Sequence, residues 1–175
     1  MLKNIIFILV LILLSIVFVY TLYLFIWFIL TRNVPFVPLS KKQLKTVSAN
    51  IKLNPEDKIV DLGCGDGRVL RIFEKQGVKD LTGYEVNFWI YLLARIKNTI
   101  LKSKAKIYFK NFEKVNLSEY NVVFCYLSDY YMNSLLKEKF DRELKPGTKI
   151  ISYVFDIKNW RKPEIISGKI FVYKI

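Results

Sequence analysis

The sequence contains no histidine, and this absence excludes several kinds of active site. A Ser-His or Cys-His nucleophile pair needs an imidazole, and so does a metal site with histidine ligands. Cysteine is scarce too, because the chain of 175 residues has only two. Two distant cysteines form no disulfide framework, which favours a reducing compartment. We therefore expect chemistry that needs neither imidazole nor a metal.

Acidic residues are few relative to basic ones. The chain has 28 Lys and Arg residues against 15 Asp and Glu residues, which gives a formal net charge of +13. An excess of this size favours an anionic partner, such as a lipid surface, a nucleic acid or an acidic protein. Composition alone leaves these three open.

Charged side chains are missing altogether from residues 4–31. A helix of that length is about 42 Å long, whereas the hydrocarbon core of a bilayer is about 30 Å thick. Residues 1–33 are therefore predicted to form a single transmembrane anchor. A signal peptide is the main alternative, but its apolar region is usually about 7 to 15 residues long and precedes a small-residue cleavage site.

The charges on either side of this segment predict its orientation. Only Lys3 precedes the apolar run, whereas Arg32, Lys41, Lys42 and Lys45 follow it closely. The positive-inside tendency places the N-terminus outside and the rest of the chain in the cytoplasm. There the basic residues would face anionic lipid, at about 1 kcal/mol for each nearby cation. We prefer this explanation of the net charge to nucleic-acid binding.

After the anchor, predicted strands alternate with predicted helices. Residues 34–52 are interpreted as a linker and lid helix, with Ser40 as the N-cap, and residues 53–175 as one domain. The predicted strands are 58–62, 81–86, 106–109, 121–127, 149–155 and a closing hairpin of 165–166 and 169–173; the predicted helices are 41–52, 66–76, 87–102 and 131–144. This alternation predicts an α/β, Rossmann-like, mostly parallel sheet with helices on both faces and a C-terminal antiparallel hairpin.

Glycine is also sparse, but three of the seven glycines stand at alternate positions in one predicted strand-to-helix loop. The residues of this candidate cofactor site are Asp61, Gly63, Cys64, Gly65, Asp66 and Gly67. A dinucleotide fingerprint would need a further glycine where Arg68 stands. The carboxylates of Asp61 and Asp66 would repel a pyrophosphate. They suit S-adenosylmethionine, which carries an ammonium and a sulfonium and no phosphate.

The ends of the next two strands supply the rest of the predicted cofactor site. Glu85 follows Gly67 by 18 residues and can accept hydrogen bonds from both ribose hydroxyls. Val86 and Phe112 are candidates to enclose the adenine. The amide oxygen of Asn111 could accept a hydrogen bond from the adenine amino group.

With these residues in view, the chain resembles the class I, seven-strand methyltransferases. More narrowly, it resembles the membrane-anchored family that includes the lysine methyltransferases of the adenine nucleotide translocase and of the ATP synthase c-subunit. The motifs that carry the narrower resemblance follow the apolar segment and are residues 35–38, 61–68 and 83–87. The chain departs from this family at Ser128 and Asp129, where relatives commonly have a proline after the fourth strand.

The resemblance implies methyl transfer to lysine on a membrane-protein substrate. A lysine amine has an ordinary pKa of about 10.4 and must lose its proton first, which burial assists. Asp129 and Ser128 are candidates to hold the amine. The predicted walls of the channel are Tyr126 and Tyr130, and the predicted lid is Phe36 with Pro38. The alternative for the aromatic residues is core packing, and for Asp129 a helix cap.

Two other functions stay open on the sequence. One is methylation of a small or lipid-soluble acceptor by the same kind of site. The other is a non-catalytic membrane tether that binds S-adenosylmethionine.

Overall fold

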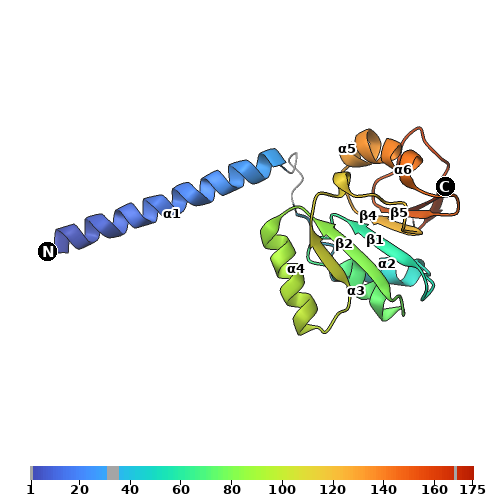
Figure 1. Cartoon of the computed structure of the whole chain (residues 1–175), viewed down its shortest axis with the longest axis horizontal. Helices are drawn as coiled ribbons and strands as arrows, with labels where there is room; N and C mark the ends of the chain where they lie inside the picture. The colour runs from blue at the N-terminus through green and yellow to red at the C-terminus, as the bar shows by residue number, and fades with distance from the viewer. Residues whose placement is uncertain (1, 31–35, 168) are drawn as a thin grey trace. The chain divides into compact units, whose positions relative to one another are not determined.

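The computed structural model describes residues 2–30, 36–167 and 169–175, which divide into two compact units (Figure 1). The first unit is Met1–Pro35 and the second is Phe36–Ile175. The predicted boundary between residues 33 and 34 lies outside the described residues. The predicted lid helix belongs to the second unit, because its side chains join the core described below.

The first unit is the helix α1 (Leu2–Leu30). Its segment Lys3–Trp27 is long and apolar enough to cross a membrane, and most of its apolar side chains are exposed. The hydroxyl of Ser15 donates to the carbonyl of Ile12 at 2.7 Å, and that of Thr21 donates to the carbonyl of Phe18 at 2.9 Å. These polar groups are therefore satisfied within the helix, as a membrane segment requires.

The second unit is built on a seven-stranded sheet with the order β3-β2-β1-β4-β5-β7-β6. The strands are β1 (Lys58–Leu62), β2 (Asp80–Glu85), β3 (Lys106–Phe109), β4 (Val122–Cys125), β5 (Lys149–Tyr153), β6 (Glu164–Ile166) and β7 (Ile170–Lys174). Strands β1 to β5 pair in parallel, and β7 pairs antiparallel with β5 and β6. The predicted sheet with a closing hairpin is confirmed; Gly168 of its turn lies outside the described residues.

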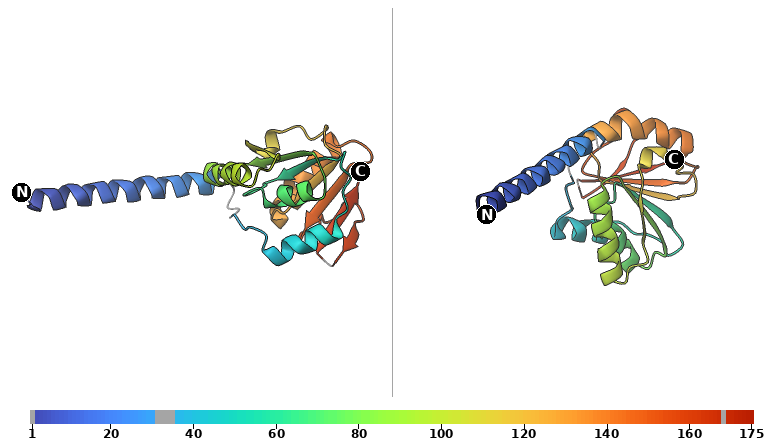
Figure 2. Two further views of the ribbon diagram at one scale, coloured as in Figure 1. Left: turned by 90° about the horizontal axis from the view of Figure 1, so that it is seen from below. Right: turned by 60° about the vertical axis from the view of Figure 1, so that its left-hand side comes forward.

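Helices cover both faces of the sheet (Figures 1 and 2). On one face lie α2 (Lys41–Asn50), α3 (Arg68–Lys75) and α4 (Phe88–Ile100). On the other face lies one continuous helical segment, formed by α5 (Asp129–Tyr131), the π-helical turn η2 (Met132–Leu136) and α6 (Lys137–Glu143). A short 3-10 helix, η1 (Phe112–Lys114), follows β3.

Two side chains fix the starts of helices beside the site. Ser40 caps α2 by accepting from the Gln43 N–H, and the Gln43 side chain accepts from the Ser40 N–H at 2.7 Å, which completes a capping box. The predicted start of this helix is confirmed. Asn87, which was predicted to be the first helical residue, is instead the N-cap of α4 and accepts from the Trp89 N–H at 3.0 Å.

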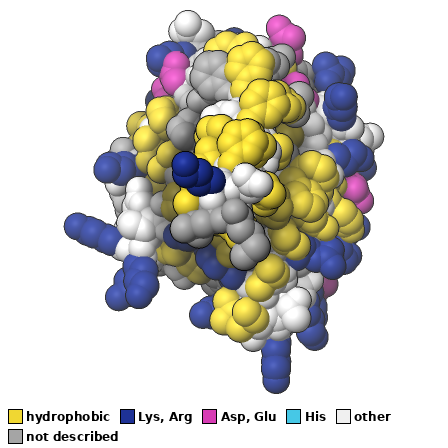
Figure 3. Space-filling view, turned by 90° about the vertical axis from the view of Figure 1, so that its left-hand side faces the viewer, with side chains coloured by type: hydrophobic (Ala, Val, Ile, Leu, Met, Phe, Trp, Pro, Cys, Tyr) yellow, Lys and Arg dark blue, Asp and Glu magenta, His cyan; other side chains and the backbone are white. Residues whose placement is uncertain are grey.

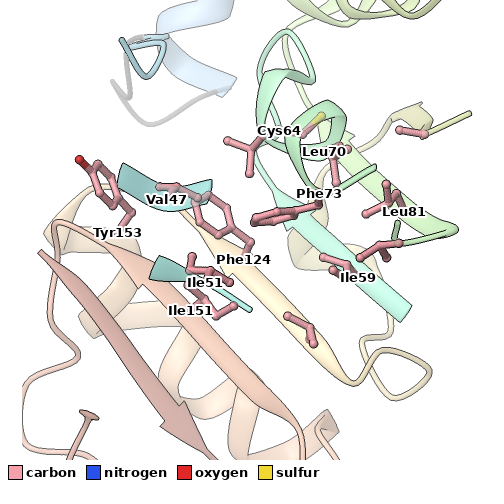
Figure 4. Close-up of a cluster of buried hydrophobic side chains, with 14 of the residues drawn as sticks. Val47, Ile51, Ile59, Cys64, Leu70, Phe73, Leu81, Phe124, Ile151 and Tyr153 are labelled. Atoms are coloured by element: carbon pink, nitrogen blue, oxygen red, sulfur yellow. The ribbon is translucent and has the colours of Figure 1, made fainter. Parts of the chain in front are cut away.

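The main hydrophobic core lies between the sheet and helices α2 and α3 (Figure 4). At its centre the rings of Phe73 and Phe124 meet edge to face, with centroids 5.6 Å apart. Val47 and Ile51, from α2 and its C-cap, are buried in the same cluster. This core fixes β1 and β4 side by side, so the loops that leave their carboxyl ends are held together.

Two predicted strands are longer than the observed ones, and one of them is β5, which ends at Tyr153 rather than at residue 155. Strand β4 ends at Cys125, whereas the apolar run that suggested a strand continues through Leu127. The ring of Tyr126 packs edge to face on Tyr153 with centroids 5.6 Å apart, and Leu127 is buried beside Gly63. Both side chains pack against neighbouring residues after the strand has ended, which is why the apolar run continues beyond it.

Candidate functional site

The glycine loop lies between β1 and α3, at the carboxyl edge of the parallel strands. Gly63, Gly65 and Gly67 all have positive φ, of 73°, 57° and 76°. Side chains other than glycine avoid this region. The N–H groups of Gly63 and Cys64 both donate to the carbonyl of Tyr84 at 3.0 Å. The loop therefore folds over the end of β2, where ligands bind in open α/β sheets.

Glu85 ties this loop to the end of β2. Its Oε2 accepts from the Gly65 N–H at 3.0 Å, and its Oε1 accepts from the Asn87 N–H at 2.8 Å. Burial raises the pKa of Glu85, and hydrogen bonds from Asn87 and Gly65 oppose that rise. Each carboxylate oxygen can accept a second hydrogen bond. Glu85 can therefore still accept hydrogen bonds from ribose hydroxyls, as predicted for a cofactor contact.

Asp61 is a buried carboxylate near the carboxyl end of β1, with 3% of its surface exposed. Burial, followed by repulsion from Glu85 and Asp66, raises its pKa to about 8. Within the described part of the chain, no hydrogen bond reaches this carboxylate. A cationic ligand would relieve both costs, because an adjacent positive charge stabilises the ionised form. The donor set therefore fits the ammonium-bearing S-adenosylmethionine.

Asp66 differs from Asp61, because cations of the same unit pair with its carboxylate. Its oxygens accept a bidentate pair from Arg68 at 2.7 and 2.8 Å, and Oδ2 also accepts from Lys97 Nζ at 2.6 Å. Burial alone would raise the pKa of Asp66, but hydrogen bonds from Arg68 and Lys97 hold it well below its ordinary value. The charge of Asp66 is therefore neutralised inside the protein and shapes the loop. Of the two carboxylates predicted to attract a cation, only that of Asp61 has no counter-charge beside it.

The segment that precedes α2 lies on the glycine loop. A Cβ atom added to Gly65 would stand 2.5 Å from Cε2 of Phe36. Arg68 Nη1 donates to the carbonyl of Leu39 at 2.6 Å, and Leu39 is buried. Phe36 itself is 37% exposed, and Pro38 is exposed. The structure therefore brings Phe36 to the cofactor loop, whereas Pro35 lies outside the described residues.

Cys64 occupies the middle of the loop as a packing residue. Its thiol is buried, and burial raises its pKa well above the ordinary value. A Cβ on Gly83 would stand 2.6 Å from its Sγ, so this close contact requires glycine in β2. The loop can therefore contribute backbone groups at Cys64, but not a reactive thiolate.

The residues predicted around the adenine lie at the ends of β2 and β3. Val86 is half-buried, and Phe112 is buried with its ring edge to face against Tyr131 at 5.8 Å. The side-chain oxygen of Asn111 accepts from the Glu113 N–H at 2.9 Å and caps η1. One further lone pair remains on that oxygen.

On the acceptor side, Tyr126 and Ser128 are half-buried after β4. Ser128 is the N-cap of α5, but its side chain makes no capping hydrogen bond there. Tyr130 is 55% exposed, and its ring stands edge to face with Tyr131 at 5.7 Å. Rings therefore run from Phe112 through Tyr131 to Tyr130, so the predicted adenine and acceptor sides adjoin.

Asp129 has a different setting from the one expected. It is the first residue of α5 rather than its cap. Its carboxylate pairs with Lys158 Nζ at 3.2 Å and accepts from the Asn133 side chain at 3.0 Å. About half of its side chain is exposed. The alternative role as the N-cap is therefore wrong, because Ser128 holds that position. A catalytic role for Asp129 stays a prediction.

Sequence reasoning missed three contributors to the site. Arg68 and Lys97 neutralise Asp66, and Leu127 lies 3.0 Å from a Cβ built on Gly63. Arg68 adjoins the glycine motif and could have been found. Lys97 lies 31 residues from its partner on another element, and no pattern in the sequence links the two. Within the described residues, Cys, Asp and Glu side chains form no group of three that could hold a metal ion.

The fold and the site together define the class of the protein. The strand order, the glycine loop after β1 and the carboxylate at the end of β2 are those of a class I, S-adenosylmethionine-dependent methyltransferase. Residues 61–164 match the family described as the ANTKMT methyltransferase domain, and the chain belongs to this family. The resemblance that the sequence motifs suggested is confirmed.

Relatives of known activity span much of the chain. A protein-lysine N-methyltransferase of Saccharolobus islandicus is 36% identical over 137 residues, which is 77% of this chain and 84% of that protein. The adenine nucleotide translocase lysine N-methyltransferase of Mus musculus is 28% identical, over 83% of this chain and 65% of its own length. The lysine N-methyltransferase of the ATP synthase c-subunit from Homo sapiens is 31% identical, over 77% and 57% respectively. The chain therefore spans less than two thirds of these two mammalian relatives.

Solved structures agree on the fold. An RNA methyltransferase from Salinibacter ruber, in complex with S-adenosyl-L-homocysteine, superposes with a TM-score of 0.68. The superposition covers 79% of this chain and 94% of the RNA methyltransferase chain, at 24% sequence identity. At that identity the similarity concerns the fold alone.

Proposed function

We propose that the protein transfers a methyl group from S-adenosylmethionine to a lysine side chain of a membrane-associated protein. The observation that carries this proposal is the 36% identity to a protein-lysine N-methyltransferase over 84% of that relative. Two further relatives act, by name, on the adenine nucleotide translocase and on the ATP synthase c-subunit. The apolar helix α1 gives this chain a means of reaching acceptors in a membrane.

The cofactor would be held by the residues that end β1, β2 and β3. We assign the ammonium to Asp61, the ribose hydroxyls to Glu85, and the adenine to the space between Val86 and Phe112, with Asn111 beside it. When bound, the cofactor supplies an electrophilic methyl group on a sulfonium. The glycine loop can turn tightly beside it, because Gly63 and Gly65 adopt positive φ.

The acceptor amine would enter beside Tyr126 and Ser128. Apolar neighbours such as Leu127 exclude water, which favours the neutral amine that transfer requires. The Ser128 hydroxyl can accept a hydrogen bond from that amine and align it. Phe36, seated on Gly65, would close the site and connect it with the chain that leads to α1.

We further propose that α1 spans a membrane with the methyltransferase unit on the cytoplasmic side. The support is the charge asymmetry described above, with Lys3 before the helix and Arg32, Lys41, Lys42 and Lys45 after it.

The test uses membranes that contain the full chain and radiolabelled S-adenosylmethionine. The expected result is label in a protein band that yields methyl-lysine on hydrolysis. Label confined to an organic extract would instead identify a small or lipid-soluble acceptor. No label, with calorimetric cofactor binding intact, would leave the non-catalytic tether.

A matched pair of variants ties the activity to the site. Asp61→Asn removes the buried carboxylate and is expected to abolish both cofactor binding and labelling. Asp80→Asn makes the same change at a half-buried position at the opposite end of the strands, and is expected to retain both. Equal behaviour of the two variants would contradict the assignment of Asp61.

A further inference from the structure

Helix α4 carries apolar side chains on two sides, one buried and the other exposed. Ala94 is buried and Tyr91 packs against the core, on the side that faces the sheet. Six large apolar side chains of the same helix are exposed: Phe88, Trp89, Leu92, Leu93, Ile96 and Ile100. At about 100° per residue these six fall within roughly 140° of the helix circumference. We call this surface the outer face of α4.

The neighbouring strand extends this surface. Phe109, at the end of β3, is 53% exposed, and its ring lies 5.6 Å from that of Phe88. A helix on the surface of a water-soluble protein carries charged residues on its outward side. A contiguous exposed apolar surface of this kind marks an interaction site.

The charges around the outer face favour anionic lipid as its partner. Residues 86–112 contain six Lys or Arg residues and no Asp or Glu. Two of the six pair with Asp66 and Asp80; the other four, all exposed, are Arg95, Lys102, Lys104 and Lys110. Lys and Arg side chains also stand out around the outline of the molecule in Figure 3. Apolar and aromatic side chains flanked by cations are typical of helices that lie in a membrane interface.

The chain length keeps the second unit close to any membrane that α1 enters. Leu30 ends α1, and Phe36 begins the second unit six residues later. Six residues reach at most about 20 Å. The local concentration of lipid around the second unit is therefore high, so even a weak contact would be populated.

We propose that the outer face of α4, together with Phe109, docks into the interfacial layer of the membrane that carries α1. This inference rests on the membrane anchorage proposed above. Docking would hold the methyltransferase unit in one orientation, because α4 is tied to the glycine loop through Lys97 and Asp66. The acceptor site would then lie at a fixed height above the bilayer.

Trp89 is the reporter for the test. Trp27→Phe and Trp160→Phe leave it as the only tryptophan of the full chain, which is placed in vesicles of phosphatidylcholine and phosphatidylglycerol. Brominated lipid tails are expected to quench Trp89 emission. Aqueous iodide is expected to quench the emission of the vesicle-bound protein at least about twofold less than that of the protein extracted with detergent. Quenching by iodide alone would overturn the proposal. Protection from both quenchers would do so too, since protein would then cover the face.

Two matched substitutions complete the test. Ile96→Glu places a charge in the middle of the outer face and is expected to reduce lipid quenching at least about twofold. Ile165→Glu makes the same change at an exposed position on β6 and is expected to leave quenching unchanged. Calorimetric cofactor affinity serves as the folding control for both. Equal quenching in the two variants would overturn the proposal.

Flotation of the vesicles separates this inference from the anchorage on which it depends. A chain that fails to float with vesicles contradicts the anchorage. A chain that floats, resists carbonate extraction and still exposes Trp89 to iodide contradicts only the docking of α4.

Discussion

The backbone N–H of Gly65 donates to Oε2 of Glu85 at 3.0 Å, across 20 residues of sequence. This bond joins the glycine loop to the end of β2, while the other oxygen of Glu85 accepts from Asn87. The carboxylate that we assign to the ribose therefore also holds the loop in shape. Cofactor binding and loop geometry depend on the same side chain.

Glu85→Gln is expected to lower the affinity for S-adenosylmethionine by about 10- to 100-fold. The amide has one acceptor oxygen for two backbone donors, and its NH2 group would face the other N–H. Hydrogen bonds to a charged group are worth about 1.5–3 kcal/mol each. Isothermal calorimetry measures the change. Glu56→Gln, at a side chain that is 87% exposed, is the control and should bind normally.

Gly65→Ala is expected to remove cofactor binding as well as stability. Its φ of 57° is unfavourable for alanine, at about 1 kcal/mol, and the new methyl group would meet Phe36. Gly147→Ala is the control, because its φ of 90° is also positive while no atom lies within 4 Å of the added carbon. Thermal unfolding should show a loss in both variants, and calorimetry a loss of at least about tenfold in affinity only at Gly65. Normal binding by Gly65→Ala would remove the loop from the site.

The sequence was sufficient for much of this arrangement. The strand Lys58–Leu62 was predicted with the observed bounds, because it is an apolar run that ends at a glycine. The loop after it is longer than predicted, since α3 begins at Arg68 rather than at residue 66. Ser40 predicted the start of α2 for an equally local reason. Features of this kind depend only on residues that are close in the sequence, so they can be predicted from a single sequence.

What the sequence could not supply depends on distant partners. The pairing of Asp66 with Lys97 is set by the packing of α4, and without it Asp66 looked like a ligand for a cation. The ion pair of Asp129 with Lys158 likewise joins residues that lie 29 positions apart, so no local pattern predicts it. The exposed apolar side chains on one face of α4 belong here too, because the sequence predicted a helix over 87–102 without showing which of its faces packs. Hydrophobicity shows that a face avoids water, but not what covers it.

Asp61 gives the ligand-free protein a characteristic dependence on pH. In the folded protein its pKa is about 8, against an ordinary value of 3.8. Between these values the folded state keeps a proton that the unfolded chain loses, so stability falls as pH rises from about 4 to about 8. We expect the melting temperature of the wild type to fall more steeply over this range than that of Asp61→Asn. Parallel curves would contradict the raised pKa.

A saturating concentration of S-adenosylmethionine should reduce that difference, since a bound ammonium favours the ionised carboxylate. The contribution of Asp61 to the change in melting temperature of the wild type between pH 5 and pH 8 should then be small. A slope unchanged by the cofactor would mean that its ammonium binds elsewhere.

Lys97→Met tests the neutralisation of Asp66. The substitution keeps the apolar stem and removes one of the two cations on a carboxylate that is 2% exposed. We expect a loss of about 2 kcal/mol in the free energy of unfolding, typical of a hydrogen bond to a buried charge. Lys106→Met removes an exposed partner 3.9 Å from Asp80 and should cost less than about 1 kcal/mol. Denaturant titration compares the two, and equal losses would show that burial of Asp66 does not matter.

Ser128→Ala and Asp129→Asn distinguish the two neighbours on the acceptor side. Ser128 is half-buried with its hydroxyl not used in capping, so its loss should lower kcat about tenfold, the equivalent of one hydrogen bond. Asp129 forms a surface ion pair with Lys158, and its amide variant should stay within about twofold of the wild type. Measuring kcat and KM separately at saturating cofactor shows whether alignment or binding has changed. The opposite ranking would mean that Asp129 leaves Lys158 and turns to the acceptor during turnover, which is the role that the sequence predicts for it.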